Sequence, residues 1–114
     1  MAVPGINEML VPFLAAIKDG KPRQREQIKQ HIARHFNLSE KDLQQKGGNS
    51  TLAIVNHLAW CDVHLCGAEF AVKNANSTNH MQDEFTITPR GLHELKTNPE
   101  KITVAYLMSF RKSQ

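Results

Sequence analysis

The stretch from Thr51 to Leu95 constrains the fold of this chain more than any other segment. It begins with a largely apolar, helix-like segment that contains Trp60 and continues through Gly67-Ala68 into a polar loop. A short strand-like segment, 85–88, follows and leads into Pro89-Arg90-Gly91, which is typical of a helix start. A buried helix that feeds a two-stranded ribbon and closes on a capped helix is the order of a winged helix-turn-helix. The sequence therefore predicts a mainly α fold with a small β wing, in the α+β class.

The length and composition define the class of protein. With 114 residues the chain is long enough for one core, so we predict a single winged-helix domain over 1–114. Its core is expected at about 5–97 and a helical extension at about 99–111. An apolar fraction of 40% is typical of a soluble globular protein. Because the sequence has neither a signal-peptide pattern nor the ~20 consecutive apolar residues of a membrane span, we expect a cytoplasmic protein without a membrane partner.

Apolar spacing and capping signals predict the individual elements. Ser39 and Asp42 have the spacing of a capping box, Ser50 is an expected cap of the following helix, and Thr88 precedes a proline as a helix cap does. The expected helices cover 6–17, 24–36, 40–45, 51–66, 88–96 and 98–110, and the expected strands cover 70–72 and 85–88.

The helix expected over 51–66 has a wide apolar arc and an opposite, polar side. Asp62 intrudes on the apolar arc, so its carboxylate should have a partner if it is buried. The polar side carries four residues: Asn56, His57, Trp60 and His64. Asn56 is suited to bond adenine through two hydrogen bonds, whereas Trp60 is expected to be structural, packed under the wing or at a dimer contact.

Charge is distributed unevenly along the chain. Residues 18–46 hold eight Lys/Arg and four Asp/Glu, a net charge of +4, and residues 86–114 have a net charge of +3. Residues 47–85 hold one lysine and four acids, a net charge of −3. A phosphate-facing surface should therefore use the first and last thirds of the chain, and we expect their cationic side chains to gather on one common surface.

The chain resembles the N-terminal domain of Mrr-type restriction endonucleases over nearly its whole length. Segments 11–14 and 19–21 are similar to the opening helix and turn of that domain, and 56–61 is similar to its central Asn-Arg-x-x-Trp-Ala helix. Segment 87–91 is similar to its Ile-Thr-x-x-Gly return, and the tail resembles the segment that leads toward the nuclease domain. The resemblance implies a module of a modification-dependent restriction system that recognises DNA and is detached from its catalytic half.

The sequence departs from this family pattern at two positions of the central helix region. His57 stands where the family commonly has arginine, and Glu69 stands where it has glycine. The acidic residues and lysine of the nuclease half have no counterpart. We therefore expect no enzymatic activity, in agreement with the lack of a carboxylate pair, a phosphate-cradling glycine loop or a Ser/His/Asp pattern.

The predicted partner is double-stranded DNA, with methylated DNA as one option. The candidate DNA-binding residues are Arg23, Arg25, Lys29, Arg34, Asn56, His57, His64, Lys73 and Arg90. The basic residues of the second helix are expected to face outward and follow the phosphate backbone, although they are equally typical of a solvated helix face. The polar residues Asn76, Ser77, Asn79 and His80 of the wing are weaker candidates, because a surface loop has the same composition.

Two alternatives remain open from the sequence. One is a protein-interaction or dimerisation module, with a regulatory or anti-restriction role as a variant, in which Ile102, Leu107 and Phe110 form an exposed apolar patch for a second copy or a nuclease domain. The other is a zinc site at His57, Cys61 and His64, with His35 or His80 as a fourth ligand. Because a small buried thiol is common in protein cores, we predict no metal and no cofactor.

The two cysteines, Cys61 and Cys66, lie five residues apart on one expected helix. At that spacing their side chains point to different sides of the helix, so a disulfide between them is not expected. Both are typical of reduced thiols in a cytosolic protein.

Overall fold

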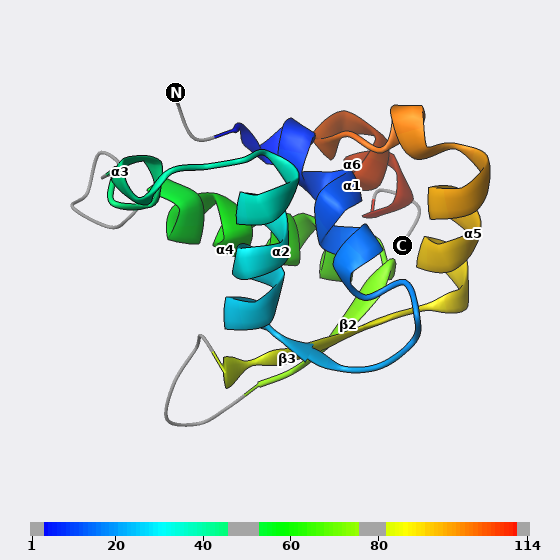
Figure 1. The fold of residues 1–114 in the computed structure, drawn as a ribbon. Coiled ribbons are helices and arrows are strands. Elements are labelled where there is room, and N and C mark those ends of the chain that lie inside the picture. Colours follow the sequence, from blue (N-terminus) through cyan, green and yellow to red (C-terminus); the bar gives the residue numbers. More distant parts are fainter. Residues whose placement is uncertain (1–3, 46–52, 76–81, 112–114) are drawn as a thin grey trace.

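The computed structural model describes residues 4–45, 53–75 and 82–111 and has the predicted mainly helical α+β fold. Its helices are α1 (Ile6–Ala16), α2 (Arg25–His35), α3 (Glu40–Leu43), α4 (Ala53–Gly67), α5 (Pro89–Thr97), the 3₁₀ helix η2 (Pro99–Lys101) and α6 (Val104–Arg111). Its strands are β1 (Arg23–Gln24), β2 (Ala71–Asn74) and β3 (Glu84–Ile87). Figure 1 shows the strands along one side of the molecule, with α1, α2 and α4 packed over them.

The sheet has three antiparallel strands in the order β1-β3-β2, so the prediction of a two-stranded ribbon was incomplete. Arg23 of β1 lies opposite Phe85 of β3, and Lys73 of β2 lies opposite Phe85 from the other side. A strand of two residues between two helices has too few positions to show an alternating pattern. It nevertheless fixes the start of α2 to the sheet, and it places β1 and β2 at opposite edges.

The core lies between the sheet and the three helices α1, α2 and α4. Phe13 of α1 and Phe85 of β3 are fully buried, and their rings meet edge to face with centroids 5.4 Å apart. Ile28 and Ile32 of α2 and Leu58 of α4 are also fully buried. The helical spacing in the sequence identified these inward-facing positions.

The predicted caps of α3 and α5 are confirmed. The Ser39 hydroxyl accepts a hydrogen bond from the Asp42 backbone N–H at 3.1 Å, and the Asp42 carboxylate accepts one from Ser39 N–H at 3.0 Å. At α5, the Thr88 hydroxyl accepts from the Gly91 N–H at 3.0 Å and donates to the Glu69 carbonyl at 2.6 Å. The second contact fastens the start of α5 to the end of α4. The predicted Ser50 cap lies outside the described residues.

The C-terminal apolar segment belongs to the core of the domain. Ile102 and Leu107 are almost completely buried, and the Phe110 ring packs against the Phe70 ring at 5.2 Å. The Val104 backbone N–H donates to the Asn7 side chain of α1 at 2.8 Å, which holds α6 in place. The alternative in which Ile102, Leu107 and Phe110 form an exposed patch is therefore wrong, because Ile102 and Leu107 are buried and Phe110 is half-buried.

Among the described residues, the helices are too short or too polar for any of them to cross a lipid bilayer.

Candidate functional site

The outward side of α4 is an exposed face without fixed charge. Trp60 is 49% exposed and Val63 is 45% exposed, whereas Asn56 is half-buried. The Trp60 ring stacks on the His64 ring with centroids 6.1 Å apart and planes at 27°. We call Asn56, Trp60, Val63 and His64 the α4 face. This exposure does not fit the expectation that Trp60 packs under the wing, whereas its other expected position, at a dimer contact, stays a prediction.

His57 is held by the beginning of the described chain. Its Nδ1 lies 2.8 Å from the Pro4 carbonyl oxygen, and the ring is half-buried. Cys61, one turn further along α4, is fully buried, and its thiol donates to the Ile6 carbonyl at 3.7 Å. Both residues therefore connect α4 to the start of α1. This arrangement places His57 at the border of the α4 face and outside its exposed centre.

Arg25 is buried, which contradicts the expectation that the basic side chains of α2 all face outward. Its Nη2 lies 2.9 Å from the Asp62 carboxylate and 3.3 Å from the Asp83 carboxylate, and all three side chains are at most 7% exposed. The guanidinium also lies over the Phe85 ring at 5.3 Å. Lys73 Nζ approaches Asp62 at 3.6 Å from the outer side. The prediction that a buried Asp62 requires a partner is confirmed, and Arg25 has a structural role.

Three cationic side chains lie near α4 or its C-terminal end. Lys29 follows Arg25 by one helical turn, so it lies on the side of α2 that faces α4, and its Nζ is 3.0 Å from Glu26. Lys73 on β2 is 40% exposed. Arg90 is 46% exposed and donates to the Ala68 carbonyl at 3.0 Å. These three residues are the predicted DNA-binding cations that border α4.

A hollow of about 610 Å³ separates β2 from the start of α5, and both Lys73 and Arg90 line it. Cys66, Val72 and Pro89 contribute apolar atoms to its walls. Glu69 also lines this hollow, 4.0 Å from Arg90, and reduces its positive charge. The hollow is therefore a mixed surface at the end of α4, bordered by two cations and one acid.

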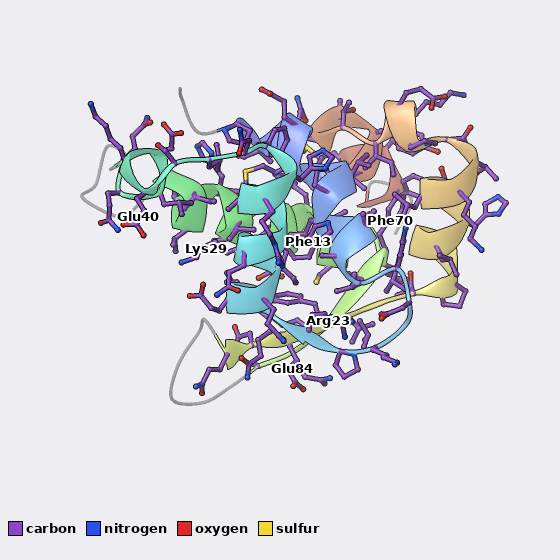
Figure 2. The ribbon with its side chains drawn as sticks, viewed as in Figure 1. Phe13, Arg23, Lys29, Glu40, Phe70 and Glu84 are labelled. Atoms are coloured by element: carbon purple, nitrogen blue, oxygen red, sulfur yellow. The ribbon has the colours of Figure 1, made fainter. Side chains whose placement is uncertain are left out.

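Arg23 and Arg34 belong to a different surface. They line a smaller hollow, about 200 Å³, together with Ala16 at the end of α1. Figure 2 shows Arg23 beside the sheet and Lys29 further along α2. Arg23 and Lys73 lie on the two edge strands of the sheet, each opposite Phe85 of the central strand β3. Arg25 is buried, so it cannot belong to the expected common surface of cations, and a common surface for the other cations stays a prediction.

The described residues contain no group of three His, Cys, Asp or Glu side chains that could hold a metal ion. The alternative zinc ligands His57, Cys61 and His64 do not form a common site, because Cys61 is fully buried and His57 faces the Pro4 carbonyl. His80 and the wing residues Asn76, Ser77 and Asn79 lie outside the described residues.

We predict that both thiols are unreactive in the folded protein. Burial, followed by the charge of Asp62, raises the pKa of Cys61 and of Cys66 to about 12. Because the thiolate is the nucleophile, a disulfide reagent at pH 8 should label neither thiol over minutes and should label both in denaturant. A thiol that reacts rapidly in the native protein would contradict this burial.

The arrangement of α2, α3 and α4 beside the β2–β3 hairpin defines a domain of the winged helix-turn-helix class. A family model described as the Mrr N-terminal domain matches residues 7–97, and the chain belongs to this family. The comparison with family models finds no nuclease domain in the chain. No curated protein and no solved structure matches the chain significantly.

Sequence reasoning missed the ionic contacts that assemble the site. Asp62 gave a signal, because a carboxylate on an apolar arc requires a cation. The sequence did not identify which cation, because Arg25 is 37 residues away and looks like its exposed neighbours on α2. Val63 was also missed, since an exposed apolar residue on a helix resembles a core residue until the packing is known.

Proposed function

We propose that this domain binds double-stranded DNA, with α4 facing the major groove and Lys29, Lys73 and Arg90 contacting phosphates on either side. The observation that carries the proposal is the exposure of the α4 face beside the hairpin, in a helix-turn-helix arrangement. The second helix of such an arrangement is the one that enters the major groove. Membership of the Mrr N-terminal family supports the same assignment.

In this proposal α4 contacts the bases without contributing a lysine or arginine of its own. No Lys or Arg occurs between Ala53 and Gly67, so phosphate attraction has to come from neighbouring elements. Asn56 offers an amide that bonds adenine through two hydrogen bonds. Trp60 and Val63 offer apolar atoms, which favour the methyl groups of pyrimidines.

The salt dependence of binding tests the phosphate contacts. Three contacts predict a slope of log K against log salt of about −3, because each contact contributes roughly −0.9. Lys73→Gln should make the slope less steep by about 0.9, whereas Lys101→Gln, an exposed lysine on η2, should leave it unchanged. A slope near zero, or equal effects of both variants, would reject the proposed interface.

We expect the α4 face to prefer methylated DNA. Duplexes that differ only by pyrimidine methyl groups should bind with different affinity, the methylated duplex more tightly, because apolar contact with a methyl group is worth more than contact with water. Trp60→Ser should remove the difference. Equal binding of both duplexes to the unchanged protein would reject methyl recognition and leave attraction to the DNA phosphates as the source of affinity.

A second candidate function, protein interaction, is favoured by the exposed apolar side chains. Met108 on α6 is 43% exposed, in addition to Trp60 and Val63. A dimer formed through these residues would show a sedimentation coefficient that increases with concentration, and Val63→Asp would abolish the increase. A monomer at all concentrations would exclude the dimer and leave DNA as the proposed partner.

We also propose that the domain has no enzymatic activity of its own and is located in the cytoplasm. Two free thiols on α4 support a reducing compartment. Incubation of the purified domain with methylated and unmethylated duplexes in the presence of Mg²⁺ should give no cleavage, and cleavage products would contradict this part.

A further inference from the structure

The small hollow between α1, β1 and α2 has no part in the interface proposed above. Its lining residues are Ala16, Arg23, Gln27, Gln30, His31 and Arg34. We propose that this hollow, which we call the α2 hollow, binds a phosphate group. Its volume of about 200 Å³ exceeds that of several water molecules, at roughly 30 Å³ each in the liquid.

The donors in the α2 hollow fit an oxyanion. Arg23 and Arg34 carry guanidinium groups, whose planar N–H donors match the oxygens of a phosphate. Gln27 uses its side-chain oxygen to accept the Gln24 backbone N–H at 2.8 Å. Its NH₂ group therefore remains for an acceptor in the hollow. The lining set contains no Asp or Glu.

The positive charge around the hollow is only partly neutralised. Asp19 lies at its edge, 2.8 Å from the Arg23 guanidinium, and it also accepts the Lys21 backbone N–H at 3.0 Å. Arg34, which also lines the hollow, is exposed. Asp19 balances the charge of Arg23 but not that of Arg34. A phosphate bound between the two guanidinium groups would therefore neutralise positive charge that remains in the hollow.

His31 reports on this environment. The pKa of His31 is lowered mainly by burial, and the positive charges of His35, Arg34 and Lys18 lower it further. The charged groups around His31 are Lys18, which follows α1, Arg34 and His35 on α2, and Arg23 of β1, which lines the same hollow and is paired with Asp19. A bound anion would counter these positive charges and raise the pKa of His31, so binding should strengthen as the pH falls through that pKa.

The proposal does not depend on DNA binding by α4. The α2 hollow includes Arg23 of β1, whereas the α4 face adjoins β2 at the other sheet edge. Two sources of phosphate fit these donors, the free ion and a backbone phosphodiester of DNA, because both present negatively charged oxygens to the guanidinium groups.

The experiment follows the imidazole resonances of His31 in the whole chain by NMR, at constant ionic strength, with His31→Gln for assignment. Inorganic phosphate should shift them saturably, and sulfate, which does not titrate near neutral pH, should raise the pKa of His31 by about one unit. Arg34→Gln should weaken phosphate binding several-fold. Lys41→Gln, an exposed lysine on α3, should leave it unchanged.

A duplex DNA arm distinguishes the two sources of phosphate. A response of His31 to inorganic phosphate supports a free-ion site, and a response to duplex DNA alone, reduced by Arg34→Gln, supports a backbone site. No response to either ligand, or equal losses in Arg34→Gln and Lys41→Gln, would overturn the proposal. Lys73→Gln should weaken DNA binding at α4 but preserve the response to inorganic phosphate, so the two proposals fail independently.

Discussion

Arg25→Ala is expected to lower the free energy of unfolding by about 3–5 kcal/mol, because it removes the cation from a buried ionic network. Arg25 bonds Asp62 of α4 and Asp83 next to β3, and its backbone N–H donates to the Asp83 carbonyl at 2.9 Å. Without the guanidinium, the buried carboxylates of Asp62 and Asp83 would lose the cation that they share, although Lys73 would remain 3.6 Å from Asp62. The network joins α2, α4 and the sheet, so its loss should affect the whole domain.

Urea unfolding measures this effect, with Arg23→Ala as the matched control. Arg23 also pairs with an aspartate, but its side chain is 34% exposed, so its loss should cost less than about 1 kcal/mol. The combined variant Arg25→Met, Asp62→Asn and Asp83→Asn should recover part of the stability, because it removes the uncompensated charges together with the arginine. Equal costs for Arg25→Ala and Arg23→Ala would contradict the structural role of Arg25.

Gly91→Ala is expected to destabilise the domain by about 2–3 kcal/mol through overpacking. A Cβ on Gly91 would lie 2.1 Å from the Phe70 carbonyl oxygen and 2.9 Å from its carbon. Both are backbone atoms, and the Phe70 carbonyl also accepts the Thr88 N–H at 3.1 Å, so they have little freedom to move. The substitution should push α5 away from the end of α4.

The sign of this effect is informative, because helix propensity alone predicts the opposite. Alanine is favoured over glycine by about 1 kcal/mol inside a helix, and Gly91 lies in the first turn of α5. Gly5→Ala provides the control, since its Cβ would meet only the Glu8 side chain at an ordinary 3.5 Å. Thermal unfolding should show a large loss for Gly91→Ala and a small change for Gly5→Ala. A stabilised Gly91→Ala variant would mean that α5 does not approach Phe70 this closely.

Local patterns in the sequence predicted the elements that depend on local forces. The apolar spacing of α1, the capping box of α3 and the N-cap of α5 each involve residues within about one to three helical turns. Gly91 appeared in the sequence as part of a helix start, and the structure adds the reason why it lacks a side chain. The fold class followed from the order of these elements.

Features that depend on distant contacts were not predictable in the same way. Arg25 has the same side-chain chemistry as Arg23, and only the positions of Asp62 and Asp83 make it a buried residue. The alternative of a protein-interaction module placed Leu107 on an exposed patch, whereas the structure buries it. Its partners are on α4, which precedes it by about 40 residues.

The candidate site shows the same division. Helical spacing correctly placed Asn56, Trp60 and His64 on the side of α4 away from the apolar arc. The positions of the cations around α4 depend on sheet order, which the sequence did not reveal because β1 is so short. The interface proposed here therefore keeps Lys29, Lys73 and Arg90, and it assigns Arg23 and Arg34 to a separate hollow.

Fluorescence of Trp60 during titration with duplex DNA tests the central proposal most directly, because this is the one tryptophan in the chain. If α4 faces the major groove, the emission of Trp60 should change saturably, over the same DNA concentrations as the anisotropy of a labelled duplex. Lys73→Gln should move both curves to higher concentration. DNA binding that leaves the Trp60 emission unchanged would show that the duplex binds elsewhere and would contradict the account.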